Sequence, residues 1–329
     1  MNSPFTDKEM ELKIEKRSIT FRKEKFEILY HYYYCSDFDE QITDPSLEEI
    51  NINQVYNQYR SKYNLPFPDE IKEIREQYHI SSSKMSTLLG FGINTYKNYE
   101  NGEVPSESNS KLIQLAKDPN SFKNILTLNH AFANQKSDKL LKRIDELIWN
   151  NEQQKQTHYV LQYIFGHDQP NEFSGFRTAN IDLMTEMIVY FTEKLRPHKS
   201  TLNKLLFYAD FLQYKKSCFS ISGSKYHKIA TMGPAPDNSN TLFELIHNNK
   251  DIDIVYEWEN HAPCERFLPM REFRKDLFNV SQLETMDIVI KNFGKLDSEC
   301  SINKEFSILQ ELKDPNENLS YNLGFEMSI

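Results

Sequence analysis

The chain has 329 residues, with 26% charged residues, 13% aromatic residues and a net charge of −9 at neutral pH. This composition predicts packed globular domains rather than disorder, and the length predicts two or three of them. The acidic balance excludes a generally cationic nucleic-acid coat but is compatible with a local DNA-binding surface. The sequence lacks both a long apolar run and a signal peptide, so we expect a cytoplasmic protein that does not associate with membranes.

The cysteines and histidines give no pattern of a metal or redox site. The four cysteines are Cys35, Cys218, Cys264 and Cys300, and no two of them have CxxC spacing. They are too few for a disulfide framework in a chain of this length, so we expect reduced thiols. The histidines form no HExxH motif. The sequence therefore predicts no metal site, no cofactor and no catalytic residues.

The first predicted segment, residues 1–64, begins with strands and ends with a helix. Residues 19–34 are rich in aromatic and β-branched side chains around a charged turn, which predicts a hairpin. Residues 46–63 carry apolar side chains at helical spacing. Pro66 and Pro68 interrupt that spacing, so we expect the helix to end before them.

The second segment, residues 65–131, predicts a series of short helices. The first begins at Pro68, because proline and acidic residues favour the first turn of a helix. We expect the next helix to begin at one of the serines 81–83 and to end at Leu89. A tight turn at residues 90–92 then leads into a third helix over residues 93–99. Further helices are predicted over residues 108–117 and from Pro119 onward.

The helices on either side of the turn at Gly90 have the spacing of a helix-turn-helix, whose second helix enters the DNA major groove. Met85 and Tyr96 are expected to be buried. The residues predicted to contact DNA are Asn94, Lys97 and Asn98 at the bases and Ser82, Ser83 and Lys84 at the phosphates. Residues 66–130 contain 7 Lys and Arg against 8 Asp and Glu. A helical bundle without a DNA role is therefore the alternative.

Residues 132–174 are predicted to hold connecting helices and a linker near Pro170. Within them, residues 137–149 form an amphipathic helix, whose apolar stripe serves internal packing or pairs two subunits. Residues 175–329 alternate helices with short strands. Their predicted elements are helices 181–195, 202–214, 238–248, 281–293 and 303–312, a strand-like segment 219–236, strands near 252–257 and 264–268, and a final strand 319–327. Helix 202–214 is apolar nearly all round and is expected to be buried.

Residues 73–119, with Tyr59-Arg60 before them, resemble the helix-turn-helix of MqsA-type antitoxins through an "IRE…LG.G.NT…YE.G…PS" pattern. The resemblance implies an XRE-type, lambda-repressor-like fold and places the family's base-contacting positions on Asn94 and Asn98. The second position is usually arginine in the type member. The family's N-terminal domain binds zinc through two CxxC pairs, but here only Cys35 remains of them. The resemblance thus implies a zinc-less N-terminal domain.

Residues 202–246, with the motif "KLLFYAD" and the later "GPAP", resemble the Panacea domain of SocA-like and GepA-like antitoxins. Residues 319–328 resemble the last strand of that domain, and Asn303-Lys304 replaces a His-Glu pair common in the family. The resemblance implies that this domain neutralises a toxin by direct binding. The predicted partner-binding residues are Lys204, Tyr208, Tyr226, Gly233 and Pro234. As the alternative, Tyr208 and Asp210 fill the core.

Taken together, the sequence predicts a mainly helical α+β protein with a helix-turn-helix in the middle and a helical C-terminal domain with short strands. The expected function is that of a non-enzymatic antitoxin of a type II toxin–antitoxin system. Its partners would be a cognate toxin and operator DNA, which it would bind as a homodimer. The alternative is a DNA-binding transcriptional regulator of a prophage or mobile element with no toxin partner.

Overall fold

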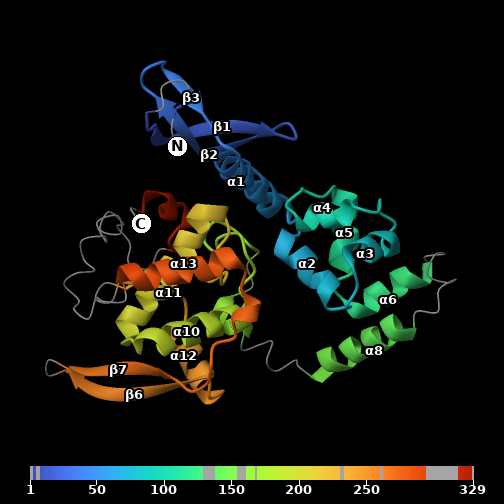
Figure 1. Cartoon of the computed structure of the whole chain (residues 1–329). Coiled ribbons are helices and arrows are strands. Elements are labelled where there is room, and N and C mark those ends of the chain that lie inside the picture. The colour runs from blue at the N-terminus through green and yellow to red at the C-terminus, as the bar shows by residue number, and fades with distance from the viewer. Residues whose placement is uncertain are drawn as a thin grey trace. The chain divides into compact units, whose positions relative to one another are not determined.

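The computed structural model of the chain describes residues 3–4, 8–128, 138–153, 161–166, 169–229, 233–259, 262–293 and 318–327. It divides into two compact units, Met1–Tyr159 and Val160–Ile329 (Figure 1). Helices dominate both units, and the strands form small antiparallel sheets. The predicted mainly helical α+β class is therefore confirmed.

The N-terminal unit begins with a three-stranded antiparallel sheet of order β1-β2-β3. Its strands are β1 (Glu11–Phe21), β2 (Glu24–Cys35) and β3 (Glu40–Ile42). The predicted hairpin is confirmed, and it is longer than expected. Arg22 and Lys23 form its turn with φ angles of 47° and 70°, the left-handed conformations that tight hairpins require.

Helix α1 (Pro45–Tyr63) packs on this sheet. Asp44 caps its N-terminus, where its carboxylate accepts a hydrogen bond from the backbone N–H of Leu47 at 2.8 Å. The cluster between helix and sheet contains Phe26, Ile28, Val55, Tyr59, Leu65 and Val104. Because Leu65 and Val104 belong to the helical part that follows, this part and the sheet share one hydrophobic cluster.

Short helices follow, as predicted: α2 (Pro68–Glu76), α3 (Ser82–Leu88), α4 (Thr95–Glu100), α5 (Glu107–Leu115) and α6 (Pro119–Leu128). They enclose a core that includes Ile71, Tyr78, Met85, Tyr96, Ile113 and Phe122. Helix α8 (Asp138–Gln153) adds Leu140 and Ile144 to the same core. The apolar stripe of residues 137–149 thus serves internal packing, the first of the two uses predicted for it.

The C-terminal unit is built around α11 (Lys199–Ser217), whose residues 202–214 are all buried, as predicted. Around it lie α10 (Ile181–Leu195), α12 (Ser239–Asn248) and α13 (Val280–Phe293). Two antiparallel hairpins complete the unit: β4 (Tyr226–Ile229) with β5 (Gly233–Pro236), and β6 (Ile252–Glu259) with β7 (Ala262–Pro269). The short 3-10 helix η1 (Lys275–Leu277) precedes α13.

One strand prediction for this unit is wrong, and another is correct only in part. Residues 319–327 are not a strand, because Tyr321–Glu326 form the 3-10 helix η2 and pairing with β4 is limited to an isolated bridge between His227 and Asn318. The ring of Tyr321 stacks on Phe211 of α11 with 4.1 Å between centroids, so this segment packs against α11 and does not extend the pairing with β4. The segment 219–236, predicted to be strand-like, forms strands only at β4 and β5. Its first part, residues 219–225, is irregular. The predicted helix 303–312 lies outside the described residues.

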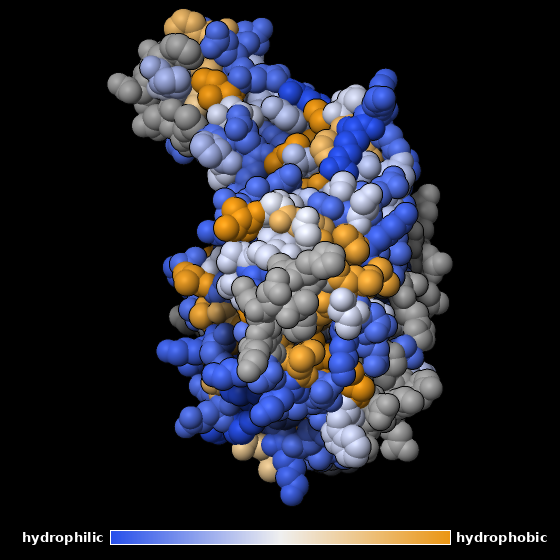
Figure 2. All heavy atoms as spheres, turned by 90° about the vertical axis from the view of Figure 1, so that its right-hand side faces the viewer, coloured by the Kyte–Doolittle hydropathy of each residue, from blue (hydrophilic) through white to orange (hydrophobic). Residues whose placement is uncertain are grey.

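Within the described residues, no helix combines the length and apolar character needed to cross a membrane. On the face drawn in Figure 2, hydrophilic residues surround small separate groups of hydrophobic ones.

Candidate functional site

The first candidate site is the helix pair α3–α4. Ser81 caps α3 by accepting a hydrogen bond from the backbone N–H of Lys84 at 3.2 Å. After α3 the chain turns at Gly90, whose φ of 75° is the left-handed conformation that glycine adopts without strain. Met85 and Tyr96 are buried, as predicted. The two helices are therefore joined by a short connection over a common core.

Three polar contacts hold α4 in its orientation. The hydroxyl of Tyr96 donates to the backbone oxygen of Ile71 at 2.7 Å, which ties α4 to α2. Arg75 of α2 donates to Glu100 at 2.6 Å. The buried hydroxyl of Ser86 in α3 accepts from the backbone N–H of Tyr96 at 3.0 Å. This last bond satisfies an N–H in the first turn of α4 that the side chain of Asn94, at the N-cap, leaves unbonded.

The outer surface of this pair carries the predicted DNA-contacting residues. Asn94, Lys97 and Asn98 are exposed at α4, while Ser83 is exposed and Ser82 and Lys84 are half-buried at the start of α3. The sequence interpretation overlooked Ile93, which is 69% exposed beside Asn94. An exposed large apolar side chain beside polar ones is a feature that sequence periodicity alone does not reveal. Contact with DNA remains a prediction for all these residues.

The loop that follows α4 is held by two arginines from the N-terminal sheet and α1. Arg60 of α1 is fully buried and donates to the backbone oxygen of Gly102 at 2.5 Å. Burial lowers the pKa of its guanidinium to about 10. Arg22, from the β1–β2 turn, donates to the backbone oxygens of Val104 and Pro105 at 2.8 and 3.0 Å. Residues of the sheet and of α1 thus hold the loop at the C-terminal end of α4, the predicted recognition helix, through hydrogen bonds.

In the C-terminal unit, Asp210 of α11 is completely buried and accepts hydrogen bonds from the segment before β4. The backbone N–H groups of Ile221 and Ser222 donate to it at 2.7 and 2.8 Å, and the Ser222 and Tyr226 hydroxyls donate to its second oxygen. Burial raises the pKa of Asp210 and outweighs the lowering by these bonds. This carboxylate is thus fully engaged inside the unit.

The predicted partner-binding residues of this unit occupy different environments. Tyr226 is fully buried against Asp210, and Tyr208 is 3% exposed, with its ring stacked on Phe293 at 4.0 Å. Neither tyrosine exposes its side chain for contact with a partner in this structure. Both fill the core, the alternative weighed for Tyr208: Tyr208 packs inward from the central helix α11, and Tyr226 packs inward from β4 with its hydroxyl bonded to Asp210. Lys204 and Pro234 are also buried.

Gly233 has a φ of 83°, a left-handed conformation that glycine adopts without strain. It begins β5 opposite Ile229. Its part in partner binding remains a prediction.

A second buried carboxylate, which the sequence interpretation missed, belongs to Glu186 of α10. Arg271 bonds both of its oxygens, and Arg274 adds its backbone N–H at 2.9 Å and its side chain at 2.7 Å. Burial alone raises the pKa of Glu186, but these hydrogen bonds together lower it below its usual value. The sequence did contain a signal for this site: Glu186 is an acid within the apolar run of residues 183–191, and a buried acid needs a partner.

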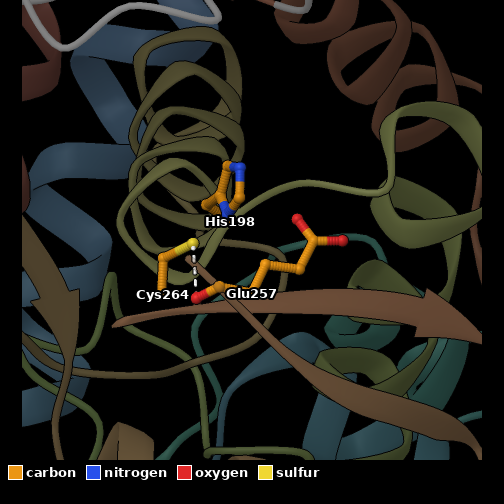
Figure 3. Close-up of side chains that lie close together, drawn as sticks. All are labelled: His198, Glu257 and Cys264. Carbon is orange, nitrogen blue, oxygen red and sulfur yellow. Dashed lines mark hydrogen bonds between the residues drawn. The ribbon is translucent and has the colours of Figure 1, made fainter. Parts of the chain in front are cut away.

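Figure 3 shows His198, Glu257 and Cys264, three residue types that bind metals. His198 precedes α11, and Glu257 and Cys264 are opposite each other in β6 and β7. Their ligand atoms lie within 4.8 Å of one another. However, the guanidinium of Arg266 donates to Glu257 and lies hydrogen-bonded to the His198 Nε2, both at 2.7 Å. A cation is therefore already in contact with two of the three groups, and the arrangement fits a metal poorly.

Residues 1–64, for which the sequence predicts no zinc site, contain a single cysteine. Cys35 is buried at the end of β2, with its sulfur 3.4 Å from the Ser3 hydroxyl. Among the described residues, no group of three potential metal ligands includes this cysteine.

Comparison with known families links the C-terminal unit to antitoxins. Residues 202–304 match the family "Antitoxin SocA-like, Panacea domain". The matched range begins within α11 and includes Asp210, both hairpins, α12 and α13. No curated protein matches the chain. The resemblance predicted for the C-terminal segment is thus confirmed as a Panacea domain at these residues, whereas the MqsA-like N-terminal part remains a prediction.

Proposed function

We propose that the chain is an antitoxin of a type II toxin–antitoxin pair and that its C-terminal unit silences a cognate toxin by binding it directly. The match of residues 202–304 to the SocA-like antitoxin family carries this proposal. The state of the buried acids supports a binding role rather than a catalytic one. Asp210 and Glu186 are both saturated by internal hydrogen bonds, so neither is available to transfer protons to a substrate.

We further propose that the helix pair α3–α4 binds the operator of the shared operon, with α4 in the major groove. Asn94, Lys97 and Asn98 would contact base edges, and Ile93 would contact a thymine methyl group. Ser82, Ser83 and Lys84 would contact phosphates. The exposed positions of the α4 residues and the three polar contacts that orient α4 support this assignment. A homodimer would read two half-sites about one helical turn apart.

Co-expression with the neighbouring gene tests the antitoxin assignment. Induction of that gene alone is expected to stop growth, and co-expression of this chain is expected to restore it. Co-purification of the two proteins distinguishes direct binding from repression of transcription, particularly when both genes are placed under foreign promoters. Restored growth that requires the native promoter would instead support a transcriptional regulator with no toxin partner.

A binding assay on operator and random DNA tests the proposed DNA contacts. Asn94→Ala is expected to cost about 1–3 kcal/mol on the operator and to relax base preference at one position. Lys84→Ala, as the matched phosphate-contact variant, is expected to weaken binding to both DNAs alike. Equal losses on operator and random DNA for Asn94→Ala would contradict the base-reading role.

A further inference from the structure

Among the described residues, no second strand bonds the backbone groups on the outer edge of β6. In an antiparallel ladder, alternate residues direct their N–H and C=O groups toward the partner strand or away from it. The backbone N–H of Met270 donates to the oxygen of Asp251 at 3.0 Å, which makes these two residues a hydrogen-bonded pair. Carried along the register, this alternation directs the backbones of Ile254, Tyr256 and Trp258 away from β7.

A second bond confirms this alternation from the opposite side of the hairpin. Phe267 lies opposite Ile254, and its backbone N–H donates outward to the oxygen of Pro197 at 3.0 Å. That edge of β7 is therefore occupied by the chain before α11. Among the described residues, β6 pairs only with β7, and Figure 1 shows β6 at the rim of its unit. The Ile254 N–H is taken by the Asp253 side chain, so Tyr256 and Trp258 are the main open positions.

The side chains at these two positions are large, aromatic and exposed. Tyr256 is 73% exposed and Trp258 is 79% exposed, and they lie two residues apart on one face of the strand. Native proteins normally protect a strand edge of this kind with a lysine, a proline or a bulge, because it templates pairing with another chain. β6 has no lysine, proline or bulge, and the acids it does carry disfavour only like-charged strands. Its edge thus combines open backbone groups with an apolar contact surface.

The charges of β6 distinguish between possible occupants. The strand contains Asp253, Glu257 and Glu259 and has no lysine or arginine. Glu257 bonds Arg266 and Asp253 lies near His247, but the side chains of both acids remain 40% and 46% exposed. Pairing with β6 of a second copy would bring acids against acids, which is unfavourable between neighbouring strands. A strand with basic residues is therefore favoured over self-association.

We propose that β6 captures an extended segment of the toxin by strand addition, with the segment's basic residues against the acids of β6 and its apolar residues against Tyr256 and Trp258. Main-chain hydrogen bonds would supply affinity, and the alternate side chains would supply selectivity. The identity of the partner rests on the proposed antitoxin function. The preference for a basic, extended segment does not rest on that function, because it follows from the backbone groups and acids of β6. This strand lies within the matched residues 202–304.

Paired substitutions separate backbone pairing from side-chain contact. Tyr256→Pro removes an N–H that points away from β7, so the β6–β7 ladder is retained. Tyr256→Thr removes the ring but keeps the N–H and the β-propensity. The probe is a short synthetic peptide of alternating Lys and Val, with an alternating Glu and Val peptide as its control. Binding to the full chain is followed by the fluorescence of Trp258 in a Trp149→Phe background, since the chain has two tryptophans.

We expect the Lys–Val peptide to shift Trp258 emission to the blue, to lose affinity with added salt, and to protect the Tyr256 and Trp258 amides from hydrogen exchange. The Glu–Val peptide should not bind. Tyr256→Pro should weaken binding at least about tenfold and Tyr256→Thr about threefold. Melting curves check that both variants fold. If Tyr256→Pro unfolds, Trp258→Pro, at the other outward position, replaces it, with Trp258→Thr as its matched control, and binding is then measured by titration calorimetry because these variants lack the fluorescent residue.

Equal affinity of the Pro and Thr variants would overturn the proposal, as would a change in the oligomeric state of the chain caused by Tyr256→Pro alone. The same variants are then tested for rescue of growth against the product of the neighbouring gene. A folded Tyr256→Pro chain that binds no Lys–Val peptide yet rescues fully would also overturn it. Peptide binding without any rescue by the unmodified chain would support the strand-binding edge and contradict the antitoxin function.

Discussion

At the residue scale, the two buried carboxylates determine how the C-terminal unit holds its irregular segments. Asp210 satisfies backbone N–H groups that belong to no helix or strand, at residues 221 and 222. Glu186 does the same for Arg274 in the segment between β7 and η1. Irregular chain inside a folded unit requires such partners, because an unpaired buried N–H costs as much as a lost hydrogen bond. Both acids therefore act as structural anchors.

Replacing Asp210 tests its anchoring role. Asp210→Ala leaves two buried N–H groups without an acceptor, so we expect it to lower the free energy of unfolding by about 3 kcal/mol. Asp210→Asn retains one acceptor oxygen, so we expect it to lower the free energy of unfolding by only about 1 kcal/mol. Urea unfolding followed by circular dichroism measures both values. An Ala variant as stable as the Asn variant would show that the two backbone bonds contribute little.

The pH dependence of stability tests Glu186. Its pKa is below the usual 4.5 in the folded chain, so its charge stabilises the fold above that pH and the contribution is lost as the pH falls through the lower folded value. Because Arg271 and Arg274 are partly exposed, we expect Glu186→Gln to cost only about 2 kcal/mol at pH 7. The difference in the free energy of unfolding between Glu186→Gln and the wild type should disappear below pH 4.5, as Glu186 becomes protonated. Glu193→Gln, exposed on the same helix, keeps an oxygen that can accept from the Phe273 backbone N–H and should change stability far less at both pH values.

At the scale of elements, α4 depends on its neighbours because it is too short to be stable alone. It spans only Thr95–Glu100, and isolated helices of this length are unstable in water. Ser86, Ile71 and Glu100 connect it to α3 and α2, and Arg60 holds the loop behind it. The position of the predicted recognition surface therefore depends on tertiary contacts and not on the helix propensity of α4.

Removing the hydroxyl of Ser86 tests this dependence. We expect Ser86→Ala to destabilise the N-terminal unit by about 1 kcal/mol, as the loss of a helix cap does, because the N–H of Tyr96 is left unbonded. Ser83→Ala makes the same chemical change on the exposed side of the same helix and should leave the melting temperature unchanged. Equal stability of the two variants would show that α4 does not rely on the bond from α3.

Much of the arrangement of elements could be predicted from the sequence, because apolar periodicity and capping residues mark helices directly. Helices α1 to α6, α8 and α10 to α13 lie where that pattern placed them, within a few residues. The contacts of Arg60 and Ser86 could not be predicted, since each depends on a partner distant along the chain. The open edge of β6 is likewise a property of strand order, which a single sequence does not encode locally.

At the scale of the whole molecule, the two proposed activities lie in different compact units. The helix pair α3–α4 belongs to Met1–Tyr159, and the matched Panacea residues belong to Val160–Ile329. Each unit has its own buried residues: one around Tyr96 and Phe122, and the other around α11. The sheet and α1 share a cluster with Val104, so we expect the N-terminal unit to require its first residues in order to fold.

Separating the units tests this division of function. A fragment of residues 160–329 should fold, because α11 and the elements packed on it supply a complete core. We expect it to restore growth against the toxin as the full chain does while failing to repress the operon. A fragment of residues 1–159 should bind operator DNA without rescue, and one that begins at residue 65 should melt at a lower temperature, because it lacks Arg22 and Arg60. Calorimetry of each fragment comes first. If residues 160–329 fold but do not rescue, neutralisation requires the N-terminal unit and the division of function proposed here is wrong.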